Sequence, residues 1–240
     1  MEWVQSKERF IVGVSFDIPG MGFKNPRTGL IEGFEADLAR AAAEQVLGSS
    51  DRVDFVKVTD EERIQMLQDD RVDFVVSQLT MTPDRAEQVD FSIPYFVTRE
   101  AILVPKGSAI KGFEDLKGKR IAVTAGSISE RRMRAALPSL PGMRLVVTPL
   151  SAGNLEAVDM DQADAASNDM INLTMLQRAA AHPEQYDIID IGDRFEPKPF
   201  GMAVRKGNHT LVELLNQTIE SLKANNRITR LLEDALARVS

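Results

Sequence analysis

The feature that most constrains the fold is a regular alternation of two kinds of segment along the chain. Short runs rich in β-branched and aromatic residues predict strands at 10–16, 53–58, 72–77, 101–106, 121–125 and 145–149. In the segments 33–47, 60–68, 129–138 and 152–160, apolar residues recur every three to four positions, as in helices. This alternation predicts an α/β fold with mostly parallel sheets and helices on both faces.

Two long segments without a helical period interrupt the alternation. One is 91–105, which carries Pro94 and aromatic residues, and the other is 191–204, which contains two prolines. We interpret both as crossings between two lobes. Lobe 1 is expected to comprise residues 1–97 and 198–240, and lobe 2 residues 98–197. The last forty residues predict two amphipathic helices that cap a sheet already built.

Composition excludes several classes of function. The net charge is −7, and the Lys and Arg residues are scattered, which argues against nucleic acid or an anionic membrane as the main partner. The chain has no cysteine and only two histidines, His182 and His209, so thiolate metal sites are excluded and a histidine-based zinc site is not expected. No phosphate-binding glycine loop, calcium loop or pair of catalytic carboxylates stands out. We therefore expect no cofactor, no metal and no catalytic residue.

The sequence contains no run of eighteen apolar residues, and its N-terminus, MEWVQSKERF, lacks the basic-then-apolar order of a signal peptide. Either the protein is cytoplasmic, or it is exported by means of a signal or anchor that lies outside this sequence.

The stretch SQLTMTPDR follows the apolar run VDFVV and is the first candidate site. Thr82 and Pro83 predict the start of a helix, with a capping hydroxyl followed by a residue that has no N–H. Arg85 then falls in the first turn, near Gln78 and Thr80 at the strand end. An Arg guanidinium can bind both oxygens of a carboxylate, so these groups suggest a carboxylate site. The alternative is that Arg85 pairs on the surface with a neighbouring acidic residue and Thr80 only caps.

A second candidate lies in TAGSISE, directly after the strand predicted at 121–125. Ser127 and Glu130 have the spacing of a capping box, which predicts a helix whose free N–H groups attract anions. This signal is weak, since every βα unit needs a cap.

Two acidic clusters allow a structural and a functional interpretation. Asp169 follows a short strand and opens a helix, so it is either an N-cap or a carboxylate for an ammonium group. Thr59 and Glu62 have capping-box spacing, which leaves Asp60 and Arg63 on the first turn. A solvated ion pair is the simpler interpretation of Asp60 and Arg63.

Five segments together resemble the polar amino-acid solute-binding proteins of bacterial ABC importers, family 3, in their glutamate/glutamine-like branch. In order they are GFEADLARA, DRVDFVVSQLTMTPDRAEQVDFSIPYF, LKGKRIAVTAGSISE, QADAASND and GMAVRKGN, and the similarity runs from about residue 10 to residue 235. The resemblance implies the two-lobed type II periplasmic-binding-protein fold, in which two hinge crossings allow the lobes to close on an amino acid.

The resemblance also implies roles for individual residues. Arg85 matches the arginine that holds the ligand α-carboxylate, and Thr80 matches a hydroxyl that contacts both α-groups. The backbone carbonyl of Gln78 and the carboxylate of Asp169 match acceptors of the α-ammonium. Ser127 and Ile128 match residues whose backbone N–H groups complete the carboxylate cage.

The residues that would contact the side chain of the ligand match the family less closely. In many relatives two aromatic side chains sandwich the side chain of the ligand. The matching residues here are Ile18 and Asp60, so this aromatic pair is absent. Arg63 matches an arginine that meets the ligand's side-chain carboxylate in glutamate and aspartate binders. Ser15 stands where those relatives are often basic, and Asp17 lies beside it. The resemblance therefore favours glutamate, glutamine, aspartate or asparagine, with basic amino acids as a weaker alternative.

The remaining expectations also follow from the resemblance. The chain is expected to be a non-enzymatic, extracytoplasmic monomer that binds an amino acid and delivers it to an ABC permease. One alternative is the ligand-binding domain of a membrane sensor. Another is a cyclohexadienyl dehydratase, for which Asp60 or Asp17 would be the acidic catalyst.

Overall fold

The computed structural model describes residues 6–239, and the chain divides into two compact units. Unit 1 comprises Met1–Val97 with Pro199–Ser240, and unit 2 comprises Thr98–Lys198. The chain therefore passes from one unit to the other twice, and each unit is described below by itself.

The centre of unit 1 is a five-stranded sheet in the order β5-β1-β6-β15-β7. Its strands are β5 (Val53–Lys57), β1 (Phe10–Val14), β6 (Phe74–Val75), β15 (Ala203–Arg205) and β7 (Val89–Phe91). β1 is parallel to both of its neighbours, whereas β15 is antiparallel to both of its own. The prediction of mostly parallel pairing is correct for the first three strands and wrong for the other two. β15 lies far along the chain and inserts between β6 and β7.

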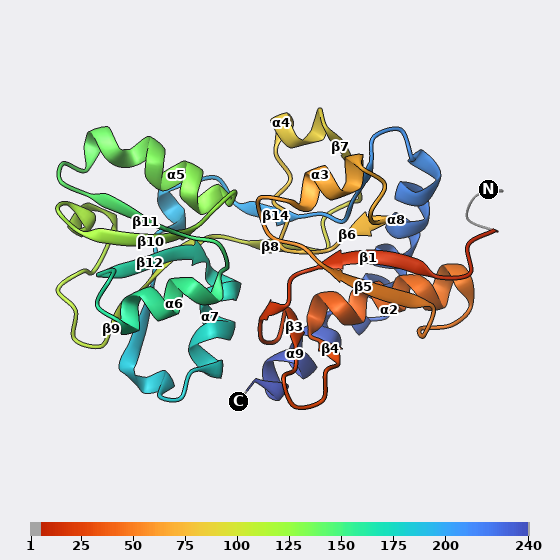
Figure 1. Cartoon of the computed structure of the whole chain (residues 1–240), viewed down its shortest axis with the longest axis horizontal. Helices are drawn as coiled ribbons and strands as arrows, with labels where there is room; N and C mark the ends of the chain where they lie inside the picture. The colour runs from red at the N-terminus through yellow and green to blue at the C-terminus, as the bar shows by residue number, and fades with distance from the viewer. Residues whose placement is uncertain (1–5, 240) are drawn as a thin grey trace. The chain divides into compact units, whose positions relative to one another are not determined.

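Helices cover both faces of this sheet because its strand residues alternate between two cores. Val75 packs with Met66 and Leu67 of α3 (Arg63–Gln68), whereas its neighbour Phe74 contacts Phe10 edge-on. Figure 1 shows α3 on one side of the sheet and α2 (Phe34–Leu47) on the other. Two C-terminal helices, α8 (His209–Ala224) and α9 (Arg227–Arg238), pack against α2, which agrees with the predicted amphipathic pair.

The start of α2 requires a glycine. Gly33 has a φ of 118°, and a Cβ at this position would lie 2.3 Å from the backbone oxygen of Met21. Because only glycine adopts this conformation without strain, Gly33 fixes where α2 begins and hence where Glu35, its second residue, lies.

Unit 2 has a second five-stranded sheet, in the order β11-β10-β12-β9-β13. Its strands are β11 (Arg144–Thr148), β10 (Arg120–Thr124), β12 (Ala165–Asp169), β9 (Glu100–Pro105) and β13 (Tyr186–Asp190). β10 is parallel to β11 and β12, and β9 is antiparallel to β12 and β13. As in unit 1, half of the strand pairs are antiparallel.

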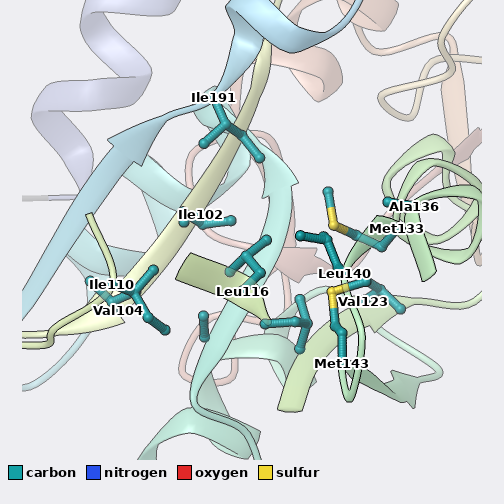
Figure 2. Close-up of a cluster of buried hydrophobic side chains, with 12 residues drawn as sticks. Ile102, Val104, Ile110, Leu116, Val123, Met133, Ala136, Leu140, Met143 and Ile191 are labelled. Atoms are coloured by element: carbon teal, nitrogen blue, oxygen red, sulfur yellow. The ribbon is translucent and has the colours of Figure 1, made fainter. Parts of the chain in front are cut away.

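The alternation along β9 shows how this sheet is buried. Ile102 and Val104 belong to the cluster shown in Figure 2, together with Met133 of α5 (Ile128–Ala136). Leu103 points to the opposite cluster, with Leu173 of α7 (Met170–Ala179) and residues of α6 (Ala152–Asp159). Figure 1 shows α5 on one face of the sheet and α6 and α7 on the other. The sheet is therefore covered on both faces, as the apolar strand runs predict.

The shorter elements complete the chain. They are β2 (Asp17–Ile18), β3 (Gly22–Lys24), β4 (Ile31–Glu32), α4 (Pro83–Ala86), β8 (Phe96–Thr98), η1 (Phe113–Leu116), η2 (Leu137–Ser139), η3 (Pro183–Gln185), η4 (Gly192–Arg194) and β14 (Lys198–Phe200). Among residues 6–239, no helix combines the length and the apolar character that a membrane span requires.

Candidate functional site

The stretch SQLTMTPDR is buried at its start, although it is polar. Ser77, Gln78 and Thr80 each expose 4% or less of their surface. β6 ends at Val75, two residues earlier than the strand predicted for 72–77, and Gln78 then adopts a left-handed backbone with a φ of 45°. A non-glycine residue in this conformation at a strand end is typical of a functional or strained turn.

Arg85 holds one end of this turn. The residue is 5% exposed, and its Nη1 donates to the backbone oxygen of Thr80 at 2.8 Å. Pro83 is the first residue of α4, as predicted, but the predicted cap is wrong. The side chain of Thr82 makes no capping hydrogen bond, and its Oγ1 is buried without a partner.

Arg63 holds the other end of the turn. Its Nη1 donates to the backbone oxygen of Ser77 at 2.5 Å and to Asp60 Oδ1 at 2.9 Å. The side chain of Arg63 is almost completely buried, and its Nε has no hydrogen-bond partner. The prediction of a solvated surface pair is therefore wrong for Arg63: the pair with Asp60 exists, but the arginine lies inside unit 1.

Glu35 of α2 binds Gln78 in the middle of the turn and was not recognised from the sequence. It has no exposed surface, and its Oε1 accepts hydrogen bonds from Gln78 N at 2.7 Å and from Tyr95 Oη at 2.5 Å. Gln78 Nε2 donates both to Glu35 Oε2 and, at 3.2 Å, to Ser15 Oγ. Burial raises the pKa of Glu35 to about 7, although the hydrogen bonds and the charge of Arg63 oppose this shift.

The positions of Ser15, Asp17 and Ile18 follow from the first strands of unit 1. Ser15 is buried after β1 and donates to the backbone oxygen of Gly22 at 3.3 Å. Asp17 is half-buried in β2, and Ile18 beside it is 1% exposed. The structure thus joins Ser15 to the Gln78 turn, whereas Ile18 belongs to the apolar core.

In unit 2, Asp169 ends β12 and precedes α7. Asp169 stands at the N-cap position of α7, as predicted, but its side chain makes no capping hydrogen bond. Instead, Asp169 Oδ1 lies 2.9 Å from Lys198 Nζ, and Asp169 Oδ2 accepts from Asn172 Nδ2 at 3.3 Å. Asn168 donates to Asn154 Oδ1 at 2.8 Å and accepts from the backbone N–H of Asp169. These bonds fix the end of β12.

Lys198 connects Asp169 to a second buried carboxylate. Its Nζ lies 2.9 Å from Glu100 Oε2 and donates to Ser129 Oγ at 2.9 Å. Glu100 has no exposed surface; it also accepts from Ser167 Oγ at 2.8 Å and pairs with Arg132 at 3.3 Å. Burial by itself would lower the pKa of Lys198, but the charges of Asp169 and Glu100 raise it above its ordinary value.

The helix start predicted after β10 is confirmed, but the capping box is only half formed, because Glu130 Oε2 accepts from the backbone N–H of Gly126 and not from that of Ser127. Ser127 Oγ accepts from the backbone N–H of Glu130 at 3.0 Å, and α5 begins at Ile128. The backbone N–H of Ser127 itself donates to the oxygen of Thr124 at 3.1 Å. Of the two amides expected to face an anion, the one on Ser127 is therefore engaged within the turn.

The buried residues that sequence reasoning missed include Glu35, Tyr95, Glu100 and Lys198. A usable signal existed for two of them. Glu35 falls among the apolar residues of its helix, and Lys198 lies between two prolines in an otherwise apolar run. A charged residue in such surroundings is rarely buried unless it is paired.

In the described part of the chain, no group of three or more His, Asp or Glu residues could hold a metal ion.

Comparisons with known proteins agree with this architecture. Residues 10–236 match the model of the bacterial extracellular solute-binding proteins, family 3. The glutamine-binding protein GlnH of an ABC transporter of Bacillus subtilis is 32% identical over 93% of this chain and 80% of that protein.

Two solved structures are also 32% identical. An ancestral arginine-binding protein bound to arginine has a TM-score of 0.84 and covers 95% of this chain and 97% of its own. An ancestral amino-acid-binding protein, a precursor of cyclohexadienyl dehydratase, has a TM-score of 0.83 and covers 98% of both chains.

Proposed function

Because this chain belongs to the bacterial extracellular solute-binding proteins of family 3, we propose that it binds a free L-amino acid outside the cytoplasm and delivers it to an ABC importer. Glutamine is the first candidate among glutamate, glutamine, aspartate and asparagine. The observation that carries this proposal is the turn from Ser77 to Thr80, which buried charged side chains hold at both ends.

Arg85 is proposed to bind the α-carboxylate of the ligand. A buried guanidinium presents five N–H donors, and one nitrogen already fixes its orientation on Thr80. The Thr80 hydroxyl and the backbone N–H groups of Ser127 and Ile128 are proposed as further donors to the same carboxylate, with Ile128 the more available because the Ser127 amide is engaged.

Asp169 is proposed to bind the α-ammonium, together with the backbone carbonyl of Gln78. Its Oδ1 is held by Lys198 and its Oδ2 by Asn172, so the carboxylate has a fixed direction. A carboxylate can accept several hydrogen bonds at once. Groups of opposite charge suit the two ends of one zwitterion.

The ion pair of Asp60 and Arg63 favours a ligand with a neutral side chain. Since the two charges lie 2.9 Å apart, they largely cancel, and the pair offers both a donor and an acceptor. An amide needs both, whereas a carboxylate would have to compete with Asp60 for Arg63. We therefore place glutamine ahead of glutamate, with Ser15 and Asp17 as further residues near the ligand side chain. The 32% identity to GlnH supports the same order.

Catalysis is the second candidate, because one similar structure is a precursor of cyclohexadienyl dehydratase. Asp60, one of its two potential acids, is engaged by Arg63. We propose that the chain binds without turnover, as a monomer. Product formation from prephenate or arogenate would contradict this.

A thermal-shift screen of the standard amino acids tests the proposal. A ligand at about 100 times its dissociation constant adds ~2.7 kcal/mol of stability, so glutamine should raise the melting temperature clearly. Arg85→Ala and Asp169→Asn should each remove the shift, because each removes a charged partner of the ligand. Arg9→Ala is the matched control, since Arg9 forms an exposed pair with Asp54. Retention of wild-type affinity by either site variant would contradict the placement of the site.

A further inference from the structure

The carboxylate of Glu35 is completely buried and is surrounded by hydrogen-bond donors. Three groups donate to it: the Tyr95 hydroxyl, the backbone N–H of Gln78 and the side-chain amide of Gln78. Two of these three donors belong to the same residue. Glu35 is therefore more than a buried acid with its hydrogen bonds filled, since it binds both the backbone and the side chain of Gln78.

Gln78 is the residue of the turn that most needs such support. Its φ of 45° lies in the left-handed region, which non-glycine residues rarely adopt. Arg63 binds the carbonyl oxygen of Ser77, which belongs to the same planar peptide unit as the Gln78 N–H. Glu35 binds this unit from the N–H side and also holds the Gln78 side chain, which neither arginine contacts through the bonds to Ser77 and Thr80.

We propose that Glu35 is a positioning residue of the amino-acid site, which holds the backbone of Gln78 in the left-handed conformation and so aims its carbonyl oxygen at the ligand ammonium. This inference rests on the proposed function, since it assigns Gln78 to that site. It adds a residue from α2 that acts on the ligand only through Gln78.

Glu35 holds Gln78 most strongly when it is ionised, because hydrogen bonds to a charged carboxylate are stronger than those to a neutral carboxyl. A protonated Glu35 can donate its proton to the Tyr95 hydroxyl, which accepts as well as donates, so the two bonds from Gln78 can stay in place. They then lose their charge-assisted character. Protonation of Glu35 therefore weakens the hold on Gln78.

This protonation falls within an accessible pH range. Burial raises the pKa of Glu35 to about 7, against the hydrogen bonds from Tyr95 and Gln78 and the charge of Arg63. Arg63 is in turn paired with Asp60. We thus expect Glu35 to hold the turn most strongly above about pH 7 and more weakly as the pH falls below it.

The first arm of the test needs no ligand. The backbone and side-chain amide resonances of Gln78 are followed by NMR from about pH 8 to about pH 5.5 in the wild type and in Glu35→Gln. We expect a titration with a midpoint near pH 7 in the wild type and none in the variant. Gln78 resonances that do not titrate in the wild type would overturn the inference.

The second arm measures the affinity for glutamine by calorimetry over the same pH range. We expect the wild-type affinity to fall about tenfold toward low pH, as for the loss of one hydrogen bond, while Glu35→Gln is weak and independent of pH. Any titration of the ligand itself appears in both proteins. The control is Glu44→Gln, since Glu44 lies on the same helix in an exposed pair with Arg227; it should keep the wild-type profile.

The outcomes separate the two proposals. An equal pH dependence in the wild type and in Glu35→Gln would overturn the role of Glu35 while leaving the proposed function standing. Absence of binding by any standard amino acid would overturn the proposed function, and the coupling of Glu35 to Gln78 would then be decided by the NMR titration alone.

Discussion

The two units contain buried carboxylates that are satisfied in opposite ways. Glu35 in unit 1 and Glu100 in unit 2 both have no exposed surface. Glu35 accepts its hydrogen bonds from a phenol and from amides, all of them neutral. Glu100 is bound by two cations, Lys198 and Arg132. Although both are equally buried, Glu35 can take up a proton near neutral pH, whereas Glu100 is paired with two cations.

The difference shows how the polar turn of unit 1 and the end of β12 in unit 2 are each held in place. In unit 1 the carboxylate fixes a strained turn, and its proton equilibrium is coupled to the geometry of that turn. In unit 2, Lys198 bridges Glu100 and Asp169, so the candidate ammonium acceptor is one member of a buried group of charges. Removing one partner from such a group leaves an uncompensated buried charge, which is far more destabilising than the loss of the pair as a whole.

The largest effect is expected from Lys198→Met. This change leaves Glu100 and Asp169 without their shared cation, and we expect the free energy of unfolding at neutral pH to fall by about 3–5 kcal/mol. Denaturant titration measures it. Lys206→Met is the matched control, because Lys206 pairs with Asp90 on the surface with half of its side chain exposed; it should cost less than about 1 kcal/mol.

The double variant Glu100→Gln, Lys198→Met sharpens this test, because it removes one negative and one positive charge together. It should be more stable than Lys198→Met alone. Equal stability of the two variants would contradict an ion-pair network around Lys198.

A somewhat smaller effect is expected for the pH dependence of stability due to Glu35. Its pKa is raised from 4.5 to about 7 in the folded protein, so the folded state binds more protons between these values and stability falls as the pH rises through this window. At ~1.4 kcal/mol per pKa unit, the loss approaches about 3 kcal/mol.

The stability of the wild type relative to Glu35→Gln should therefore decrease from about pH 5 to about pH 8, as measured by denaturant unfolding at several pH values. A constant difference would show that Glu35 does not titrate in this range and that the comparison of the two carboxylates is wrong.

Local patterns in the sequence predicted much of each unit. The six strand runs and the main helices were located to within a few residues, because amphipathic periodicity is a local property of the chain. Pairing direction was not predictable in the same way. β15 and β9 are antiparallel to their neighbours because of where the chain returns to each sheet, which no short segment encodes.

The site was predictable in its polar turns but not in its buried charges. Ser127 caps its helix as its spacing indicates, whereas Thr82 and Asp169, which have equally good cap signals, do not. Asp169 instead pairs with Lys198, which lies in a distant part of the chain. Contacts of this kind depend on the packed structure, so sequence spacing cannot reveal them. The ligand roles of Arg85, Thr80 and Gln78 stay predictions.

The most direct test of the central claim, that the chain binds an amino acid by both of its α-groups, is calorimetric titration with glutamine and with two blocked analogues. Glutamine α-amide lacks the carboxylate proposed for Arg85, and N-acetylglutamine lacks the ammonium proposed for Asp169. We predict saturable binding of glutamine and a loss of at least about a hundredfold in affinity for each analogue, since each leaves a buried charge unpaired. Equal affinity for glutamine and either analogue would contradict the account.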